Sequence, residues 1–220
     1  AQRRHFPLES LEGLRLVNAK AEPATLEGKK GLRVIETKEL QSSQPGAQRT
    51  TGESLVVVEG VEFGDGVIEA EIAGVPAPGA PETARGFVGI AFRVQSDMRT
   101  LETIYLRPTN GRAEDQERRN HSVQYASAPD WPFSRTRKEA PGKYETYVDL
   151  VPNSWTKVKI EVRGAQARLY VHGQEQPTLI VNDLKLGAQA KGAVALSAGV
   201  NSVSHFRNLT ITPAPASSRQ

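Results

Sequence analysis

Residues whose side chains could bind a ligand are concentrated between Arg93 and Trp131 of the 220-residue chain. Arg, Asn and Gln side chains present planar groups that hydrogen-bond hydroxyl and carboxylate groups in pairs, and an aromatic ring stacks on the face of a pyranose. This combination of residue types is typical of sugar-binding sites. The predicted ligand-binding residues are Arg93, Tyr105, Arg107, Asn110, Arg119, His121, Gln124 and Trp131.

The strand that should position Arg93 is the run Val88–Val94, in which every second residue is large and apolar. Alternation of this kind predicts a strand with one face in the core. It places Arg93 on the opposite face, together with the small residues Gly89 and Ala91. Because these two residues leave space above the sheet, we expect a groove there.

Two further strands should border this groove. Alternation in residues 102–107 places Tyr105 and Arg107 on the groove side, and residues 122–126 contribute Gln124. Two cations and an aromatic ring around an open floor suit a polyhydroxylated or acidic sugar. The sequence therefore predicts a carbohydrate, acidic ones included, as the binding partner.

Two polar loops flank these strands. The segment Pro108–His121 contains Asn110 and Arg119 and is too polar to lie in a core. It either contributes to the site or is a solvated loop whose charges pair internally, Glu114 or Glu117 with Arg118 or Arg119. The second loop, Asp130–Gly142, carries Trp131, which we expect at the surface, closing one end of the groove.

The dominant period of the whole chain is two, which predicts an all-β fold. Trp155 opens the clearest strand, and we expect it in the core, where replacing it by Ala would cost about 3–5 kcal/mol of stability. The alternating runs cover residues 32–35, 54–58, 66–72, 86–94, 102–107, 122–126, 144–150, 155–163, 167–173, 193–197 and 203–212.

Length and composition favour one soluble domain. We expect a single sandwich over residues 1–212 with an irregular N-terminal segment, followed by a disordered tail over residues 213–220. A formal charge of +3 does not indicate nucleic-acid binding, and no apolar run is long enough to span a membrane. The start at Ala1-Gln2 matches signal-peptide removal, which predicts a secreted or periplasmic protein. The oligomeric state stays open.

Five segments carry a resemblance to a known family: Phe63–Ile72, Gly86–Arg93, Trp155–Gly173, Gly192–Leu196 and His205–Leu209. In this order they resemble the concanavalin A-like jelly roll, as found in laminin-G-like domains and in the 3-keto-disaccharide hydrolase domain. The resemblance implies two antiparallel sheets, one of them concave, with carbohydrate bound in or beside the groove. It also implies that a structural calcium ion can be present, with oxygens from Asp65, Asn182 or Asp183.

The catalytic signature of laminarinase-like members of this superfamily is incomplete. Those enzymes carry three carboxylates on one strand, whereas this chain has only Glu69 and Glu71 at the corresponding place. We expect both to face solvent beside Lys or Arg of a neighbouring strand. His121 and His172 have no partner at a metal-ligand spacing, and the chain has no cysteine. We therefore predict no metal site and no cofactor, apart from the structural calcium ion that the resemblance allows.

Three functions are consistent with these features. The first is a secreted or periplasmic domain that binds carbohydrate on its concave face. The second is a glycoside hydrolase resembling the 3-keto-glycoside enzymes, acting on the same face, and the third is a laminin-G-like protein-interaction module. Whether the chain is an enzyme stays open, and the residues that could act as acid or base are Glu69, Glu71, Asp115 and His121.

Overall fold

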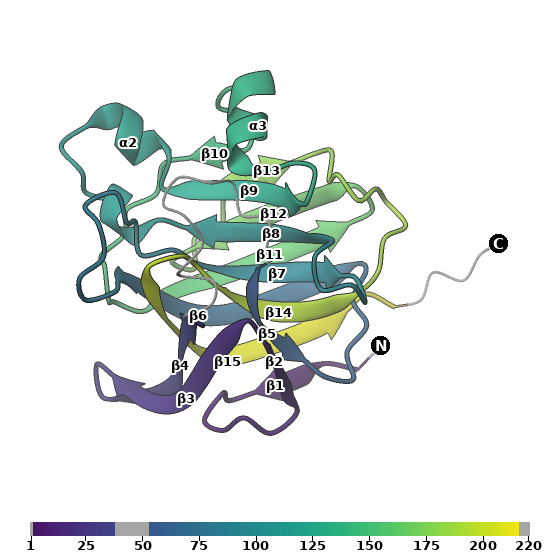
Figure 1. The fold of residues 1–220 in the computed structure, drawn as a ribbon. Coiled ribbons are helices and arrows are strands. Elements are labelled where there is room, and N and C mark those ends of the chain that lie inside the picture. The colour runs from purple at the N-terminus through teal and green to yellow at the C-terminus, as the bar shows by residue number, and fades with distance from the viewer. Residues whose placement is uncertain (1, 38–52, 216–220) are drawn as a thin grey trace.

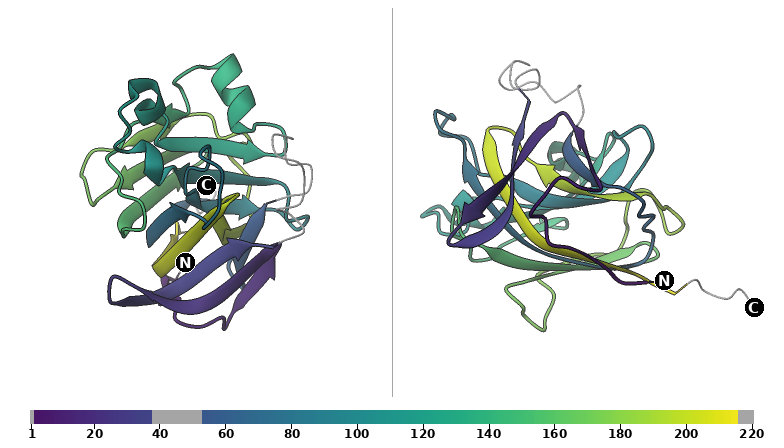
Figure 2. Two further views of the ribbon diagram at one scale, coloured as in Figure 1. Left: turned by 60° about the vertical axis from the view of Figure 1, so that its left-hand side comes forward. Right: turned by 90° about the horizontal axis from the view of Figure 1, so that it is seen from below.

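The fold is a sandwich of two antiparallel sheets in a computed structural model that describes residues 2–37 and 53–215. Figure 1 shows the two sheets face to face, and Figure 2 shows the same layers from the side and from below. The first sheet contains β1 (Arg4–Phe6), β3 (Ala19–Leu26), β4 (Lys29–Glu36), β6 (Gly66–Pro76), β11 (Thr156–Arg163), β12 (Gln166–Val171), β13 (Leu179–Val181) and β15 (Ser202–Pro213).

The second sheet has the strand order β10-β9-β8-β7-β14-β5-β2. All of its neighbours pair antiparallel, so the predicted all-β antiparallel sandwich is confirmed. Its strands are β2 (Leu14–Val17), β5 (Ser54–Val58), β7 (Val88–Val94), β8 (Leu101–Leu106), β9 (Val123–Ala128), β10 (Glu145–Thr146) and β14 (Ala193–Ala198).

In the part of the chain that the structure describes, helical structure is confined to one corner of the sandwich, above β9 and β10 (Figure 1). It consists of the 3-10 turn η1 (Pro108–Asn110), α2 (Gln116–Asn120) and α3 (Phe133–Glu139). Asp115 caps α2, because its side chain accepts the Arg118 backbone N–H at 2.7 Å. No helix in the described part of the chain has the length and hydropathy to cross a bilayer.

The main hydrophobic core fills the space between the sheets. Every second residue of the central strands contributes to it, such as Ile68 and Ile72 of β6 and Ile90 of β7. A second, smaller apolar cluster lies on the other face of the seven-stranded sheet. It is formed by Leu55, Val57, Ala91, Val94, Leu101 and Ala195.

Several expectations about the fold are wrong. The N-terminal segment is not irregular, because it supplies β1, β2 and β3, and residues 144–150 form only the two-residue strand β10. Residue 213 still belongs to β15, whereas residues 216–220 of the expected tail lie outside the described residues.

Trp155 lies before β11 and is only partly buried, so its placement in the core is wrong. Its indole N–H donates to the Leu26 carbonyl at 3.0 Å, and its ring meets the His205 ring edge-on, with 6.4 Å between the centroids. The Trp155 ring therefore packs at the surface, beside the start of β11 in the first sheet. Its indole group joins the start of β11 to β3.

Candidate functional site

A pocket of about 480 Å³ lies where the helical corner meets the end of β8. Pockets of this size are typical of small-molecule sites. Its walls come from the segment between β6 and β7, the residue after β8, η1, α2 and α3. We name it the arginine pocket; it is lined by Thr83, Arg85, Phe87, Arg107, Asn110, Asp115, Glu117, Arg118, His121, Phe133 and Arg137.

Arg107 is the deepest cation of the arginine pocket, with a relative exposure of 4%. Its Nη1 donates to the His121 carbonyl at 2.9 Å. Its Nη2 donates to the Tyr105 hydroxyl at 3.2 Å and to Oε1 of Gln124 at 3.4 Å. Because a guanidinium has five N–H donors, these three bonds hold Arg107 in place and leave two donors for other partners.

Tyr105 explains how β8 presents Arg107. Gly89 of β7 pairs with Tyr105, and a Cβ at Gly89 would come within 2.5 Å of the Tyr105 Cβ. The prediction that Gly89 leaves open space above the sheet is therefore wrong, because Tyr105 occupies the space beside the glycine. The Tyr105 ring also packs edge-on against Phe87, with 5.8 Å between the ring centroids.

His121 lies on the wall of the pocket beside the buried carboxylate of Glu145. Its Nδ1 is 2.8 Å from Oε2 of Glu145, although the N–H direction does not give a regular hydrogen bond. Arg137 donates to both oxygens of the same carboxylate, at 3.1 and 2.8 Å. Burial lowers the pKa of His121 below its usual value; Arg137 and Arg107 act in the same direction, and Glu145 opposes them. The imidazole is therefore neutral at pH 7.

Asn110 and Arg118 form a second polar pair on the wall. The Arg118 Nε donates to Oδ1 of Asn110 at 2.9 Å, and the Asn110 amide donates to the His121 carbonyl at 3.1 Å. Arg119 points elsewhere, since its guanidinium lies 5.0 Å from the Tyr147 ring and donates to the Tyr147 hydroxyl. It does not line the arginine pocket.

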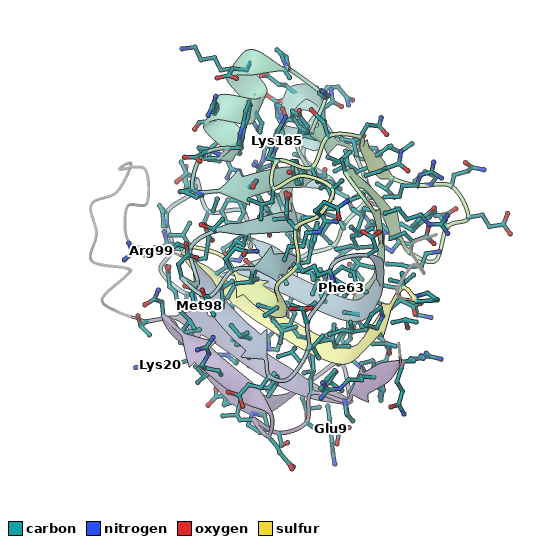
Figure 3. The ribbon with its side chains drawn as sticks, turned by 90° about the vertical axis from the view of Figure 1, so that its right-hand side faces the viewer. Glu9, Lys20, Phe63, Met98, Arg99 and Lys185 are labelled. Atoms are coloured by element: carbon teal, nitrogen blue, oxygen red, sulfur yellow. The ribbon has the colours of Figure 1, made fainter. Side chains whose placement is uncertain are left out.

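The exposed aromatic ring of the pocket is that of Phe133, not that of Trp131. Phe133 is 45% exposed, and its ring lies 5.5 Å from the Arg107 guanidinium and 5.4 Å from that of Arg137. Trp131 instead packs between Arg135, at 3.8 Å, and Lys185, at 4.2 Å (Figure 3 labels Lys185). The loop Asp130–Gly142 does reach the pocket, but it contributes the ring of Phe133 and not that of Trp131.

The predicted position of Arg93 is wrong. Between the pairs Val94–Ala193 and Ala91–Ala195, β7 has two residues where β14 has one, and Arg93 has φ of 51°. This β-bulge ends the alternation. Val94 therefore joins the outer apolar cluster, and the Arg93 side chain turns toward the end of the sandwich.

The Arg93 guanidinium is fully buried there. It donates to the carbonyls of Gly64, Gly164 and Gly187 at 3.1, 2.7 and 2.9 Å, and to Oδ1 of Asp65 at 3.2 Å. Arg93 is therefore a structural clamp on three loops. It does not line the arginine pocket.

Glu69 and Glu71 lie on β6, in the sheet opposite the arginine pocket. They cannot act on the same face as Arg107, so this part of the enzyme hypothesis is wrong. Glu71 lies 3.9 Å from the Lys29 ammonium and 3.7 Å from Arg207, and it accepts a hydrogen bond from Asn208. The two carboxylates border a separate surface hollow of about 440 Å³.

The oxygens considered for calcium already bind protein groups. Asp65 accepts from Arg93 and the Gly164 amide, and Asn182 accepts from Gln166 at 2.6 Å. Asp183 accepts from Lys143, Tyr144 and Lys185, and these bonds lower its pKa to about 2 even though burial opposes them. Within residues 2–37 and 53–215, no group of three or more His, Asp or Glu side chains could hold a metal ion.

Of the eight predicted residues, the structure brings together five. Arg107, Asn110 and His121 line the arginine pocket, and Tyr105 and Gln124 support Arg107. The sequence pattern missed Arg85, Phe87, Arg118, Phe133, Arg137 and Glu145. The four-residue spacing of Phe133 and Arg137 after Pro132 is a signal that places both on one face of a short helix.

The sandwich has a concanavalin A-like, galectin-like fold. A carbohydrate-binding module of family 66 from Bacillus subtilis is similar, with 14% identity, a TM-score of 0.59, and 91% of this chain and 96% of that one covered. A Bacillus subtilis protein of unknown function with a galectin-like fold has 12% identity and a TM-score of 0.54, with 94% of both chains covered. A Crh5 transglycosylase in complex with NAG has 12% identity and a TM-score of 0.56, with 98% of this chain and 85% of that chain covered.

The family is shown by a sequence model. The model described as a 3-keto-alpha-glucoside-1,2-lyase-like domain matches residues 9–212, and the chain therefore belongs to this family. The match confirms the predicted resemblance. None of the curated proteins matches the sequence.

Proposed function

We propose that the arginine pocket is a saccharide-binding site. The observation that carries this proposal is the arrangement of Arg107, with two guanidinium donors left over, beside the exposed ring of Phe133. Planar donors next to an exposed ring are the groups that hold a pyranose. The family membership supports a sugar as the ligand, as do a carbohydrate-binding module and a transglycosylase among the similar folds. Action outside the cytoplasm stays a prediction from the sequence.

Phe133→Ala should weaken saccharide binding by about tenfold, because a stacked ring contributes roughly 1 kcal/mol or more. A glycan array with neutral and uronic-acid oligosaccharides would identify a ligand, and calorimetry would give the affinities. Trp131→Ala is the matched control, since it removes a ring two residues away that does not line the pocket. Equal losses from both variants, or no binding by the parent protein, would contradict the proposal.

A second candidate function is elimination from a 3-keto-α-glucoside. The observation that favours it is His121, a neutral imidazole in the pocket next to Glu145. A base at this position would remove the C2 proton, the electron pair would form the C1–C2 double bond, and the C1–O bond would break. The leaving oxygen then takes a proton from water. The arginines would stabilise the negative charge that develops on the C3 oxygen.

The pH dependence of turnover tests this second function. Because the pKa of His121 is lowered, the rate should fall only when the pH drops below about 6.5. Glu145→Gln removes the charge that raises this pKa, so the acidic limb should move to lower pH. Release of 4-nitrophenol from its 3-keto-α-glucoside would be the assay, with His121→Gln expected to be inactive. An unchanged profile in Glu145→Gln, or activity in His121→Gln, would exclude His121 as the base.

A further inference from the structure

Three arginines of the arginine pocket have no carboxylate partner among residues 2–37 and 53–215. Arg85 donates to the carbonyls of Glu82 and Ala84, and Arg107 donates to a carbonyl, a hydroxyl and an amide oxygen. Arg118 donates to Asn110 and to the carbonyl and hydroxyl oxygens of Thr109. Within the described residues, no carboxylate oxygen comes within ion-pair distance of these three guanidinium groups.

Four other partly or fully buried arginines in this part of the chain do have a carboxylate partner, and one of them, Arg137, lies on the pocket wall. Arg33, Arg93 and Arg137 each contact a carboxylate at 2.8–3.2 Å, and Arg207 does so at 3.7 Å. Arg119, next to the pocket, bonds a tyrosine hydroxyl. Among the described residues, the arginine pocket thus brings together three guanidinium groups that have no carboxylate partner.

The acidic residues near the pocket do not supply the missing charge. Asp115 accepts the backbone N–H of its own helix, and Glu145 holds Arg137 and His121. The Glu117 side chain is 88% exposed, and its Oε1 lies 3.9 Å from Nε2 of His121. The unpaired guanidinium groups also act on one another, since burial and the charges of Arg118 and Arg107 lower the pKa of Arg85.

We propose that the arginine pocket selects saccharides that carry an anionic group, a carboxylate or a sulfate, and that Arg85, Arg107 and Arg118 bind this group. The inference rests on the proposed function and names the substrate class of the same site. Guanidinium groups bind planar oxyanions in pairs of hydrogen bonds, and a ligand anion would remove the repulsion among the three cations. Phe133, beside Arg107, would then pack against the sugar ring that carries the charge.

The test compares matched ligands by calorimetric titration: methyl β-D-glucuronide and D-glucose 6-sulfate against methyl β-D-glucoside, each up to millimolar concentrations. We expect at least one charged probe to bind about tenfold or more tightly than the glucoside, and its affinity to fall as salt is raised. The two charged probes distinguish a carboxylate from a sulfate. Because Arg107 is buried and its replacement could prevent folding, the variants are Arg85→Gln and Arg118→Gln, with unchanged melting temperatures as evidence of folding.

Arg119→Gln is the control, because it removes the same charge from the neighbouring position outside the pocket. Arg118→Gln should abolish the preference for the charged probe, and Arg119→Gln should retain it. Equal affinity for charged and neutral probes, or a preference that survives both Arg85→Gln and Arg118→Gln, would overturn the inference and leave the saccharide site in place. No binding of any probe would overturn both.

Discussion

Arg93→Ala should lower the free energy of unfolding by about 3–5 kcal/mol, because several groups lose a buried charged donor and each such loss costs roughly 1–3 kcal/mol. The substitution removes hydrogen bonds to three loop carbonyls and the partner of Asp65, and it leaves a cavity in a fully buried position. Urea denaturation of the two proteins would measure the difference.

Arg112→Ala is the matched control for this prediction. Arg112 also binds a carboxylate, that of Asp149, through two hydrogen bonds of 2.8 and 2.9 Å, but both side chains are mostly exposed. Exposed pairs contribute roughly 0–1 kcal/mol, so its loss should change the stability little. If the two variants were equally stable, Arg93 would not be the clamp described above.

Gly89→Ala should cost about 1–3 kcal/mol and also weaken ligand binding in the arginine pocket by about tenfold. The new Cβ would lie 2.5 Å from the Tyr105 Cβ and 2.7 Å from the Ile104 carbonyl oxygen, so the two strands must move apart. Tyr105 would carry the Arg107 guanidinium with it, because the two side chains are hydrogen-bonded. Denaturation and calorimetry on the same variant would measure the two effects.

The control for Gly89 is Ala91→Gly on the same face of β7. Ala91 belongs to the outer apolar cluster and does not line the pocket, so this change should reduce stability without reducing affinity. Affinity that is unchanged in Gly89→Ala would show that Tyr105 does not position Arg107.

Alternation of apolar residues was sufficient to predict most of the sandwich. Strand β11 was predicted nearly residue by residue, because its residues alternate between the core and the surface. Strand β5 was predicted over its whole length as a short apolar run, and both of its faces are buried. The edge strand β3 was missed, since it contains Pro23 and few large apolar residues. This composition suits an edge strand, where the N–H group that proline lacks is not needed for pairing. In the sequence alone, the same composition looks like that of a loop.

The candidate site was predicted only in part, for two physical reasons. The bulge at Arg93 depends on the pairing with β14, a partner about 100 residues away, so it has no local signature. The ring of Phe133 enters the pocket because α3 folds over the end of β9, an arrangement set by tertiary packing. Arg107, by contrast, follows a regular strand, and its proximity to Gln124 followed from the period alone.

The pairing of β1 with the end of β15 has a mechanical consequence. Arg4 lies opposite Ile211, so the two ends of the described chain leave the sheet at the same end of an antiparallel pair, as Figure 1 also shows. A force that separates these ends would break the hydrogen bonds of the pair one after another rather than all together. The first strand would therefore peel off at low force, while the arginine pocket, which is built on the other sheet, would remain intact.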